Sequence, residues 1–157
     1  MRSEMMKESC DVVGRSVFRV DGLGKLTGNA LYAGDISLPG MLHLRVVRSD
    51  RPHAMIRGIR TAEAEAYFGV VAVFTHRDIP GTNKIGRDKP DQTVLCVDKV
   101  RFIGDPVALV AAEIPEAAEE AAALIRVDYE DLPGVFSPEE ALLPAAAKVH
   151  ETGNLLM

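Results

Sequence analysis

The sequence contains no tryptophan and few aromatic residues of any kind. Aromatic residues make up 5% of the 157 positions, whereas hydrophobic residues as a whole make up 47%. Such a hydrophobic fraction excludes general disorder, and the length fits one domain with short tails. A core built without large rings must be filled by alanine, valine, leucine and isoleucine. This composition favours closely packed α/β structure over a large ligand cavity.

Positive charge, cysteine and long apolar runs are also scarce. The formal net charge is −5, which argues against nucleic acid as a partner. The N-terminus has no apolar core of a secretory signal, and the longest apolar runs are too short to span a bilayer. Cys10 and Cys96 form neither a disulfide framework nor a metal-binding spacing. These observations predict a cytoplasmic chain with no membrane partner.

The motifs of phosphate binding are incomplete. The glycine-rich run at residues 21–28 places its third glycine one residue too late for a dinucleotide fingerprint. Lys25 is followed by Leu26, whereas a phosphate-binding loop requires serine or threonine there. The run is therefore interpreted as a glycine turn.

Motifs of metal and nucleophilic chemistry are incomplete as well. His150 and Glu151 begin a zinc-helix pattern, but Asn154 occupies the position of its second histidine. No serine lies in a nucleophile-elbow motif, and Cys96 lies among apolar residues, which predicts a buried, inert thiol. His53 lies in a predicted turn that is a candidate for lining an interface. We therefore predict no catalytic, cofactor-binding or metal-ligating residue in this chain.

Hydrophobic periodicity predicts an α+β fold with a mixed sheet and two or three short helices. Leu42, Leu44 and Val46 alternate with His43 and Arg45, which predicts a strand at residues 41–48 with the leucines and the valine facing inward. Pro115 is placed as the first residue of a helix whose apolar face runs from Ala117 to Ile125. The other expected strands are 56–60, 70–74, 106–112 and 125–129, and the other expected helices are 62–68 and 138–143.

The composition along the chain suggests three segments. Residues 1–13 are expected to be a flexible tail, residues 14–144 a folded domain, and residues 145–157 the start of a linker. Turns are expected at the glycines of residues 14–40, and a long loop is expected at residues 78–92. The linker is expected to lead toward a domain that the 157 residues do not include.

Charge is distributed unevenly along the chain. Five arginines gather between positions 45 and 60, and acidic residues dominate between positions 113 and 140. Such segregation is usually a solvated surface, and it is also a candidate docking surface because complementary charge steers partners.

A series of short motifs in a fixed order resembles one enzyme family. The motifs are Val13-Gly14-Arg15-Ser16, Arg19-Val20-Asp21-Gly22, Lys25-Leu26-Thr27-Gly28, residues 32–35, Arg48-Ser49-Asp50-Arg51-Pro52-His53-Ala54, Asp78-Ile79-Pro80-Gly81 with Asn83, residues 98–108, residues 127–133, and His150-Glu151 with Asn154. Their order and spacing resemble the start of the large subunits of the xanthine dehydrogenase/aldehyde oxidase family of molybdenum hydroxylases. The resemblance extends over residues 13–156.

The resemblance implies a hammerhead domain, the α/β domain that precedes the molybdopterin-binding domains of that family. It also implies a parent oxidoreductase that hydroxylates purines, other N-heterocycles or aldehydes with oxygen from water, using molybdenum–molybdopterin, [2Fe-2S] clusters and FAD. The implied partners are a molybdopterin-binding domain or subunit and the iron–sulfur and FAD subunits. The family's catalytic glutamate and pterin-binding segments have no counterpart within these residues, so a split subunit, a truncated product or a fragment is expected. Residues 14–40 and 99–106 are expected to pack against neighbouring domains.

Two other interpretations of the sequence remain. One is a free-standing structural or protein-interaction module without enzymatic activity. The other is a small enzyme that uses Tyr32, Asp35 or His53, a class for which the sequence offers no recognisable site geometry. A purine such as xanthine is the preferred substrate of the parent enzyme under the family interpretation.

Overall fold

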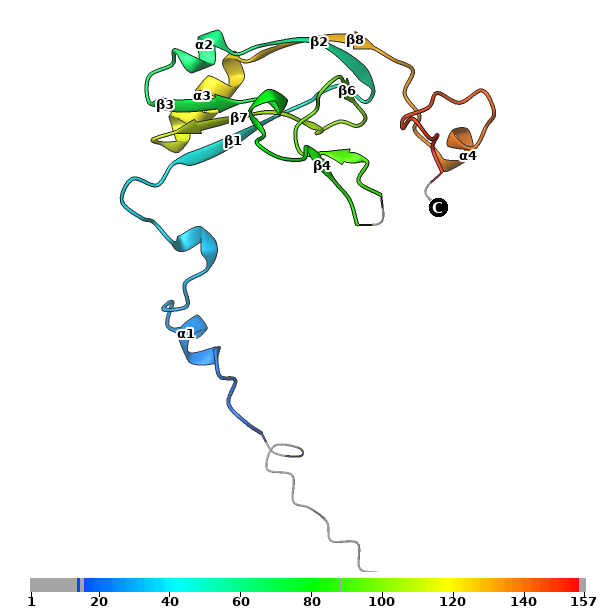
Figure 1. Ribbon diagram of the computed structural model, residues 1–157. Coiled ribbons are helices and arrows are strands. Elements are labelled where there is room, and N and C mark those ends of the chain that lie inside the picture. Colours follow the sequence, from blue (N-terminus) through cyan, green and yellow to red (C-terminus); the bar gives the residue numbers. More distant parts are fainter. Residues whose placement is uncertain (1–13, 15, 88, 156–157) are drawn as a thin grey trace, which may run out of the picture. The chain divides into compact units, whose positions relative to one another are not determined.

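The computed structural model describes residue 14 and residues 16–87 and 89–155, and it consists of two units (Figure 1). The first unit is Met1–Pro39 and the second is Gly40–Met157. The tail expected at residues 1–13 lies outside the described residues.

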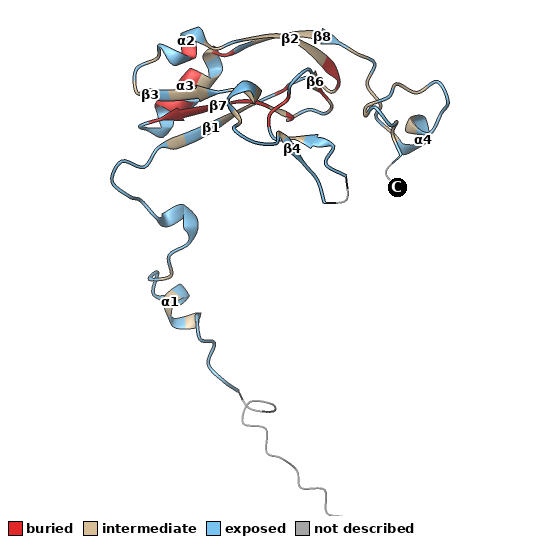
Figure 2. Cartoon of the chain, in the orientation of Figure 1, coloured by how far each residue is buried: buried red, intermediate tan, exposed pale blue. Residues whose placement is uncertain are grey.

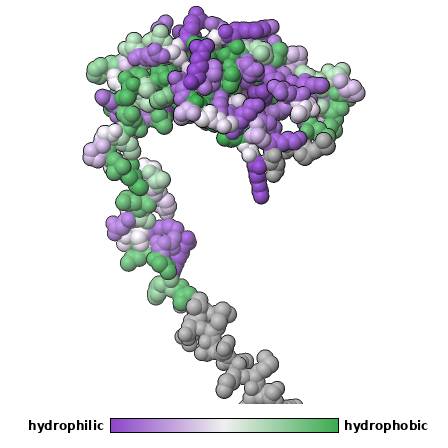
Figure 3. All heavy atoms as spheres, in the orientation of Figure 1, coloured by the Kyte–Doolittle hydropathy of each residue, from purple (hydrophilic) through white to green (hydrophobic). Residues whose placement is uncertain are grey.

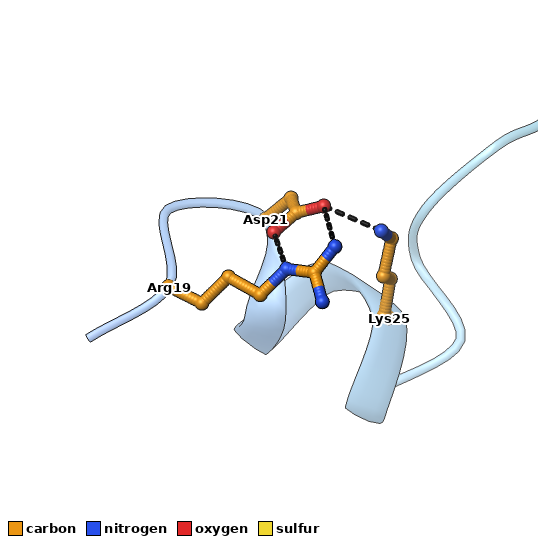
Figure 4. Close-up of polar contacts among 3 residues, drawn as sticks. All are labelled: Arg19, Asp21 and Lys25. Carbon is orange, nitrogen blue, oxygen red and sulfur yellow. Dashed lines mark hydrogen bonds and ion pairs between the residues drawn. The ribbon is translucent and has the colours of Figure 1, made fainter.

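The described residues of the first unit include two short helices, α1 (Gly22–Leu26) and the 3-10 helix η1 (Ala33–Asp35). The carboxylate of Asp21 precedes α1 and accepts hydrogen bonds from Lys25 and Arg19 (Figure 4). The hydrogen bond from Lys25, followed by that from Arg19, lowers the pKa of Asp21. The glycine-rich run interpreted as a turn thus forms a short helix over Gly22–Leu26, and Lys25 is paired with Asp21.

None of the described residues of the first unit is buried. Each of its large apolar residues has an exposed fraction of 49% or more. Figure 3 shows apolar residues along much of this unit. The large apolar residues are Val17, Phe18, Val20, Leu23, Leu26, Leu31, Tyr32, Ile36 and Leu38. A segment with so much exposed apolar surface is typical of one that another part of an assembled protein covers.

The second unit holds three sheets whose strand pairs are antiparallel. The first sheet has the order β1-β7-β3, the second β6-β2-β8, and the third is the pair β4-β5. The strands are β1 (His43–Arg48), β2 (Ala54–Arg60), β3 (Val70–Phe74), β4 (Lys84–Ile85), β5 (Gln92–Thr93), β6 (Lys99–Val100), β7 (Pro106–Ala112) and β8 (Arg126–Asp131). The helices are α2 (Ala62–Glu65), the 3-10 helix η2 (His76–Asp78), α3 (Pro115–Leu124) and α4 (Pro138–Ala141).

The core lies between α3 and β7, the central strand of the first sheet. Buried Ala117, Ala118 and Ala121 of α3 face the sheet, on which Ala108 and Val110 of β7 are fully buried (Figure 2). Pro115 begins the helix at a position where the missing N–H costs nothing, as the sequence predicts. Small side chains on both elements let the helix lie close to the strand.

A second cluster connects this core to the other sheet. Val107 of β7 packs with Ala54, Cys96 and Val100, and Tyr129 of β8 borders the cluster. On the strand from Arg126 onward the predicted alternation is confirmed, because Val127 and Tyr129 are partly buried while the charged residues between them are exposed. The α+β class predicted from the sequence is therefore confirmed.

The predicted orientation of the first strand is wrong. Leu44 is 66% exposed, whereas the face of β1 that carries Arg45 and Val47 lies toward α3. The register explains this, since Arg45 pairs with Val110 and Leu44 pairs with Ala111, which lies on the opposite face of β7. The period of two correctly separated the faces of the strand, but the helix covers the more polar face.

The loop expected at residues 78–92 is also partly structured. It contains β4 and leads into β5, which pair as a two-stranded hairpin. The expected helix at residues 62–68 ends earlier, at Glu65, and the helix expected at residues 138–143 ends at Ala141.

We predict that Ala121→Leu destabilises the chain by about 1–3 kcal/mol, because the added carbons have no room between α3 and β7. Ala123→Leu is the matched control, since Ala123 is an exposed residue of the same helix. Urea unfolding followed by circular dichroism measures both. Equal midpoints for the two variants would show that the helix does not pack tightly on the strand.

Candidate functional site

The loop between β6 and β7 is fixed to the end of β1. The N–H of Ser49 donates to the carbonyl of Asp105 at 2.9 Å, and the N–H of Gly104 donates to the carbonyl of Ser49 at 2.7 Å. The guanidinium of Arg48 donates to the Gly104 carbonyl at 2.8 Å. Ser49 and Asp105 are both buried. These hydrogen bonds make the loop a rigid edge of the domain rather than a mobile flap.

The buried carboxylate of Asp105 organises the same loop. Its Oδ2 accepts the N–H of Arg101 at 2.8 Å. The Arg101 guanidinium donates to the Lys99 carbonyl at 3.3 Å, and its Nε is buried with no hydrogen-bond partner in the described part of the chain. The aspartate therefore acts as a turn-forming side chain, which accounts for its burial.

Asn83 holds the neighbouring loop in a similar way. Its amide oxygen accepts the N–H of Leu95 at 3.0 Å, and its amide nitrogen donates to the carbonyl of Leu95 at 2.7 Å. The side chain thus replaces one rung of a β-ladder. Leu95 and Cys96 are buried beside it.

The thiol of Cys96 is unsuited to chemistry. Its side chain is fully buried, and burial, followed by the carboxylate of Asp105, raises its pKa to about 12. The thiol is therefore protonated at physiological pH, and the sequence prediction of a buried, inert cysteine is confirmed.

His53 is a buried structural residue. Its Nδ1 lies 2.7 Å from the carbonyl of Pro133, and because a carbonyl only accepts, Nδ1 carries the proton. Its Nε2 is buried without a partner among the described residues. The N–H of Leu132 donates to the carbonyl of His53, so the residue joins the start of β2 to the end of β8.

The three residues weighed for a small enzyme do not form a site in either unit. Tyr32 and Asp35 belong to the first unit, where the Asp35 carboxylate accepts the Tyr32 N–H at 3.0 Å and serves as a cap of η1. His53 belongs to the second unit and is engaged as described. Each of the three residues thus has a local structural role.

Two cavities adjoin the loop between β6 and β7. One, of about 340 Å³, is lined largely by apolar side chains, among them Ile85, Val94 and Phe102, with Arg101 at its side. A more polar one of about 370 Å³ also touches Arg101 and includes Lys84 and Asp98. Both reach the lower range of small-molecule sites, and both linings include Thr93 and His150.

The side chains of His150 and Asn154 contact other groups of the second unit. The Nδ1 of His150 lies 3.8 Å from the carboxylate of Asp91. The side chain of Asn154 accepts the N–H of Val149 and donates to the carbonyls of Ala141 and Ala147. Within the described part of the chain, no group of three histidine, cysteine, aspartate or glutamate side chains is placed to hold a metal ion.

Most arginines of the basic segment pair with acidic side chains of the second unit. Arg45 pairs with Glu119, Arg57 with Glu130, and Arg60 with Asp128. Arg51 lies 3.5 Å from Asp131. The charge clusters therefore join β1 to α3 and β2 to β8, which leaves less unpaired charge for a partner than the sequence suggested. Exposed pairs of this kind contribute little to stability.

Comparison with known proteins identifies the family of this domain. Residues 27–133 match the family described as aldehyde oxidase and xanthine dehydrogenase, a/b hammerhead domain. The chain belongs to this family. It is 52% identical over 138 residues to a probable xanthine dehydrogenase subunit of Bacillus subtilis, and 39% identical over 150 residues to the nicotinate dehydrogenase large molybdopterin subunit of Eubacterium barkeri.

Solved structures share the fold. The aldehyde oxidoreductase from Desulfovibrio gigas superposes with a TM-score of 0.81 at 36% identity, over 85% of this chain and 16% of that chain. The match covers 88% of this chain but 18% of the Bacillus subtilis relative, and 96% of this chain but 35% of the Eubacterium barkeri relative. The hammerhead domain predicted from the ordered motifs is thus confirmed, and it corresponds to a minor part of each relative. No helix among the described residues has the length and apolar character needed to cross a membrane.

We predict that Cys96 does not react with a thiol reagent at pH 8 in the folded chain and reacts fully after denaturation. A Cys10→Ala background leaves Cys96 as the only cysteine, and absorbance of the released reagent anion measures the reaction. Its folded pKa of about 12 lies above the ordinary 9.0, so between these values the unfolded state loses its proton first. Stability should therefore fall as pH rises through that window, and less so in Cys96→Ala. Rapid labelling at pH 8 would contradict the burial.

We predict that Gly104→Ala destabilises the chain by about 1–3 kcal/mol, because Gly104 has φ +100° and an L side chain rarely adopts that conformation. No atom lies within 4 Å of the added carbon, so the cost is conformational. Gly81→Ala is the control, since that position is equally open and lacks a positive φ. Thermal unfolding compares them, and an unchanged midpoint for Gly104→Ala would show that the backbone there is not strained by a side chain.

Proposed function

We propose that this chain serves as the hammerhead domain of a xanthine dehydrogenase-like molybdenum hydroxylase, as a non-catalytic part of an oxidoreductase. The observation that carries the proposal is the 52% identity to a probable xanthine dehydrogenase subunit over 88% of this chain. Its parent enzyme would hydroxylate purines, other N-heterocycles or aldehydes with oxygen from water. A purine is the preferred substrate, since this relative is named for xanthine.

We propose that the molybdenum cofactor is held outside the described residues of this chain. Among the described residues no cluster of metal-ligating side chains is present, and Cys96 is a protonated, buried thiol. We therefore assign the molybdenum–molybdopterin group to a molybdopterin-binding domain or subunit beyond these residues. The [2Fe-2S] clusters and the FAD would belong to iron–sulfur and FAD subunits, all in the cytoplasm.

The role that the geometry supports is that of a rigid spacer between domains. The loop between β6 and β7 is bonded to the end of β1 through Ser49 and Gly104, so its exposed Phe102 and Ile103 are held in a fixed position. The first unit contributes further exposed apolar side chains. Rigid presentation of apolar groups is what an interdomain contact requires.

The domain boundaries remain part of the proposal. We assign residues 14–144 to the hammerhead domain and residues 145–157 to the start of a connection toward the molybdopterin-binding domain. The bonds of Asn154 to Ala141 and Ala147 would hold the first turns of that connection against the end of the domain.

We predict that the affinity-tagged chain, purified gently from its native host, brings down a molybdopterin-binding polypeptide with iron–sulfur and flavin subunits. The molybdopterin-binding part is expected either as a separate subunit or as part of the same polypeptide. Mass spectrometry identifies the proteins, and elemental analysis measures molybdenum.

An unrelated tagged protein from the same host is the control for background. We expect about one molybdenum atom per chain and xanthine-dependent reduction of an electron acceptor. Recovery of the chain without any molybdopterin-binding partner would contradict the proposal and favour a free-standing interaction module. If the purified assembly contains molybdenum but acts on a different heterocycle or on an aldehyde, the proposed assembly stands and the proposed substrate is wrong.

A further inference from the structure

The first sheet presents an apolar face that no helix covers among the described residues of the second unit. Across β1, β7 and β3 the register forms two rows of opposed residues, Leu44 with Ala111 and Ala72, and Val46 with Leu109 and Phe74. Opposed residues in antiparallel pairs lie on the same face, so these six side chains share one surface. We call it the outer face.

The helix α3 lies on the other side of this sheet. Buried Val110 and Ala108 of β7 pack toward α3, and on β1 the guanidinium of Arg45 reaches Glu119 of the helix at 3.1 Å. Successive residues of a strand point to opposite faces, so the outer face is turned away from α3. It follows that the helix covers the side with Arg45 and leaves open the side that carries the two apolar rows.

Exposure is greatest at the two edge strands of the outer face. Leu44 of β1 is 66% exposed and Phe74 of β3 is 39% exposed, whereas Ala111 of the central strand is 3% exposed. Val46, Ala72 and Leu109 are partly buried. Isolated apolar residues on a surface are ordinary, but two full rows across three strands form a contiguous patch.

We propose that the outer face is the docking surface for the molybdopterin-binding part of the hydroxylase. This inference rests on the proposed function and adds the surface through which the domain would be held. The contact would be apolar and centred on Leu44 and Phe74, with no charged side chain among the six residues. Interface cores are depleted of charge in this way.

The length of the relatives identifies the occupant. The matched region is 18% of the Bacillus subtilis relative and 35% of the Eubacterium barkeri relative, whose name includes a large molybdopterin subunit. In each of these two relatives the larger remainder of the polypeptide is therefore present in equal amount with the matched region. A second copy of this chain, or a separate redox subunit, has no comparable support.

The charges elsewhere on the second unit favour the outer face as the docking surface. Arg57 and Arg60 on β2 are paired with acidic residues of β8, so that sheet presents neutralised pairs rather than an unpaired charged surface. Desolvating such pairs is costly, whereas covering the outer face releases water from apolar carbon.

Photocrosslinking in the native assembly tests the proposal. The photoreactive residue p-benzoylphenylalanine replaces Leu44 in one variant and Phe74 in another, the second being an aromatic-for-aromatic exchange. Phe68, which is 92% exposed and lies outside the outer face, receives the same residue as the matched control. After affinity purification and irradiation, peptide mass spectrometry identifies the cross-linked partner.

We expect positions 44 and 74 to cross-link to the molybdopterin-binding part, and position 68 to give no cross-link to it above background. Cross-links from 44 and 74 to a second copy of this chain, to residues 14–39 of its own chain, or to an iron–sulfur or flavin subunit would overturn the proposal. Absence of cross-links at both positions in an assembly that contains the molybdopterin-binding part would overturn it too, while leaving the proposed function intact. If purification before irradiation recovers no such part, the proposed function itself fails.

Discussion

The close approach of α3 to β7 is the constraint on which the rest of the domain depends. Ala117, Ala118 and Ala121 leave room for the helix to lie directly on Ala108 and Val110. Because β7 is the central strand, its position fixes β1 and β3 on either side. Val107 of the same strand packs in the cluster around Cys96. The contact between α3 and β7 therefore fixes the strand that connects the two buried clusters of the second unit.

This constraint also determines what the domain leaves exposed. The helices α2 and α3 cover one side of the three-stranded sheet, and the buried alanines of α3 lie on that side. The opposite side keeps Leu44 and Phe74 in solvent, and the first unit keeps its leucines and phenylalanine in solvent as well. Such a surface is unusual for an independent protein of this size and ordinary for one domain of a larger one. The small share of each relative that the chain matches points the same way.

The sequence predicted those parts of the fold that depend on local pattern. The strands at residues 70–74 and 106–112 agree with β3 and β7, and Pro115 begins α3, because continuous apolar runs and an N-terminal proline act locally. The orientation of β1 could not be obtained in this way. Alternation shows that the faces of a strand differ, but only tertiary packing decides which face the helix covers, and the Arg45–Glu119 pair bridges 74 positions of sequence.

In the candidate site, too, the sequence predicted local properties but not contacts that depend on tertiary structure. The inert character of Cys96 followed from its apolar neighbours, and that prediction is confirmed. The roles of Asn83, Asp105 and Asn154 as backbone anchors did not follow, because each bonds main-chain groups whose proximity is set by loop geometry. Likewise, the pairing of Arg57 with Glu130 and of Arg60 with Asp128 did not follow from the sequence, because folding sets β2 beside β8. The family resemblance, carried by the order of many short motifs, supplied what the individual residues could not.

The proposed role of this domain requires that its outer face packs against the part of the enzyme that binds molybdopterin. A cryo-electron microscopy map of the native assembly tests it most directly. We expect Leu44 and Phe74 to be buried against that polypeptide, with the molybdenum bound by residues outside this chain. A map in which the outer face is open to solvent, or in which this chain supplies a metal ligand, would contradict it.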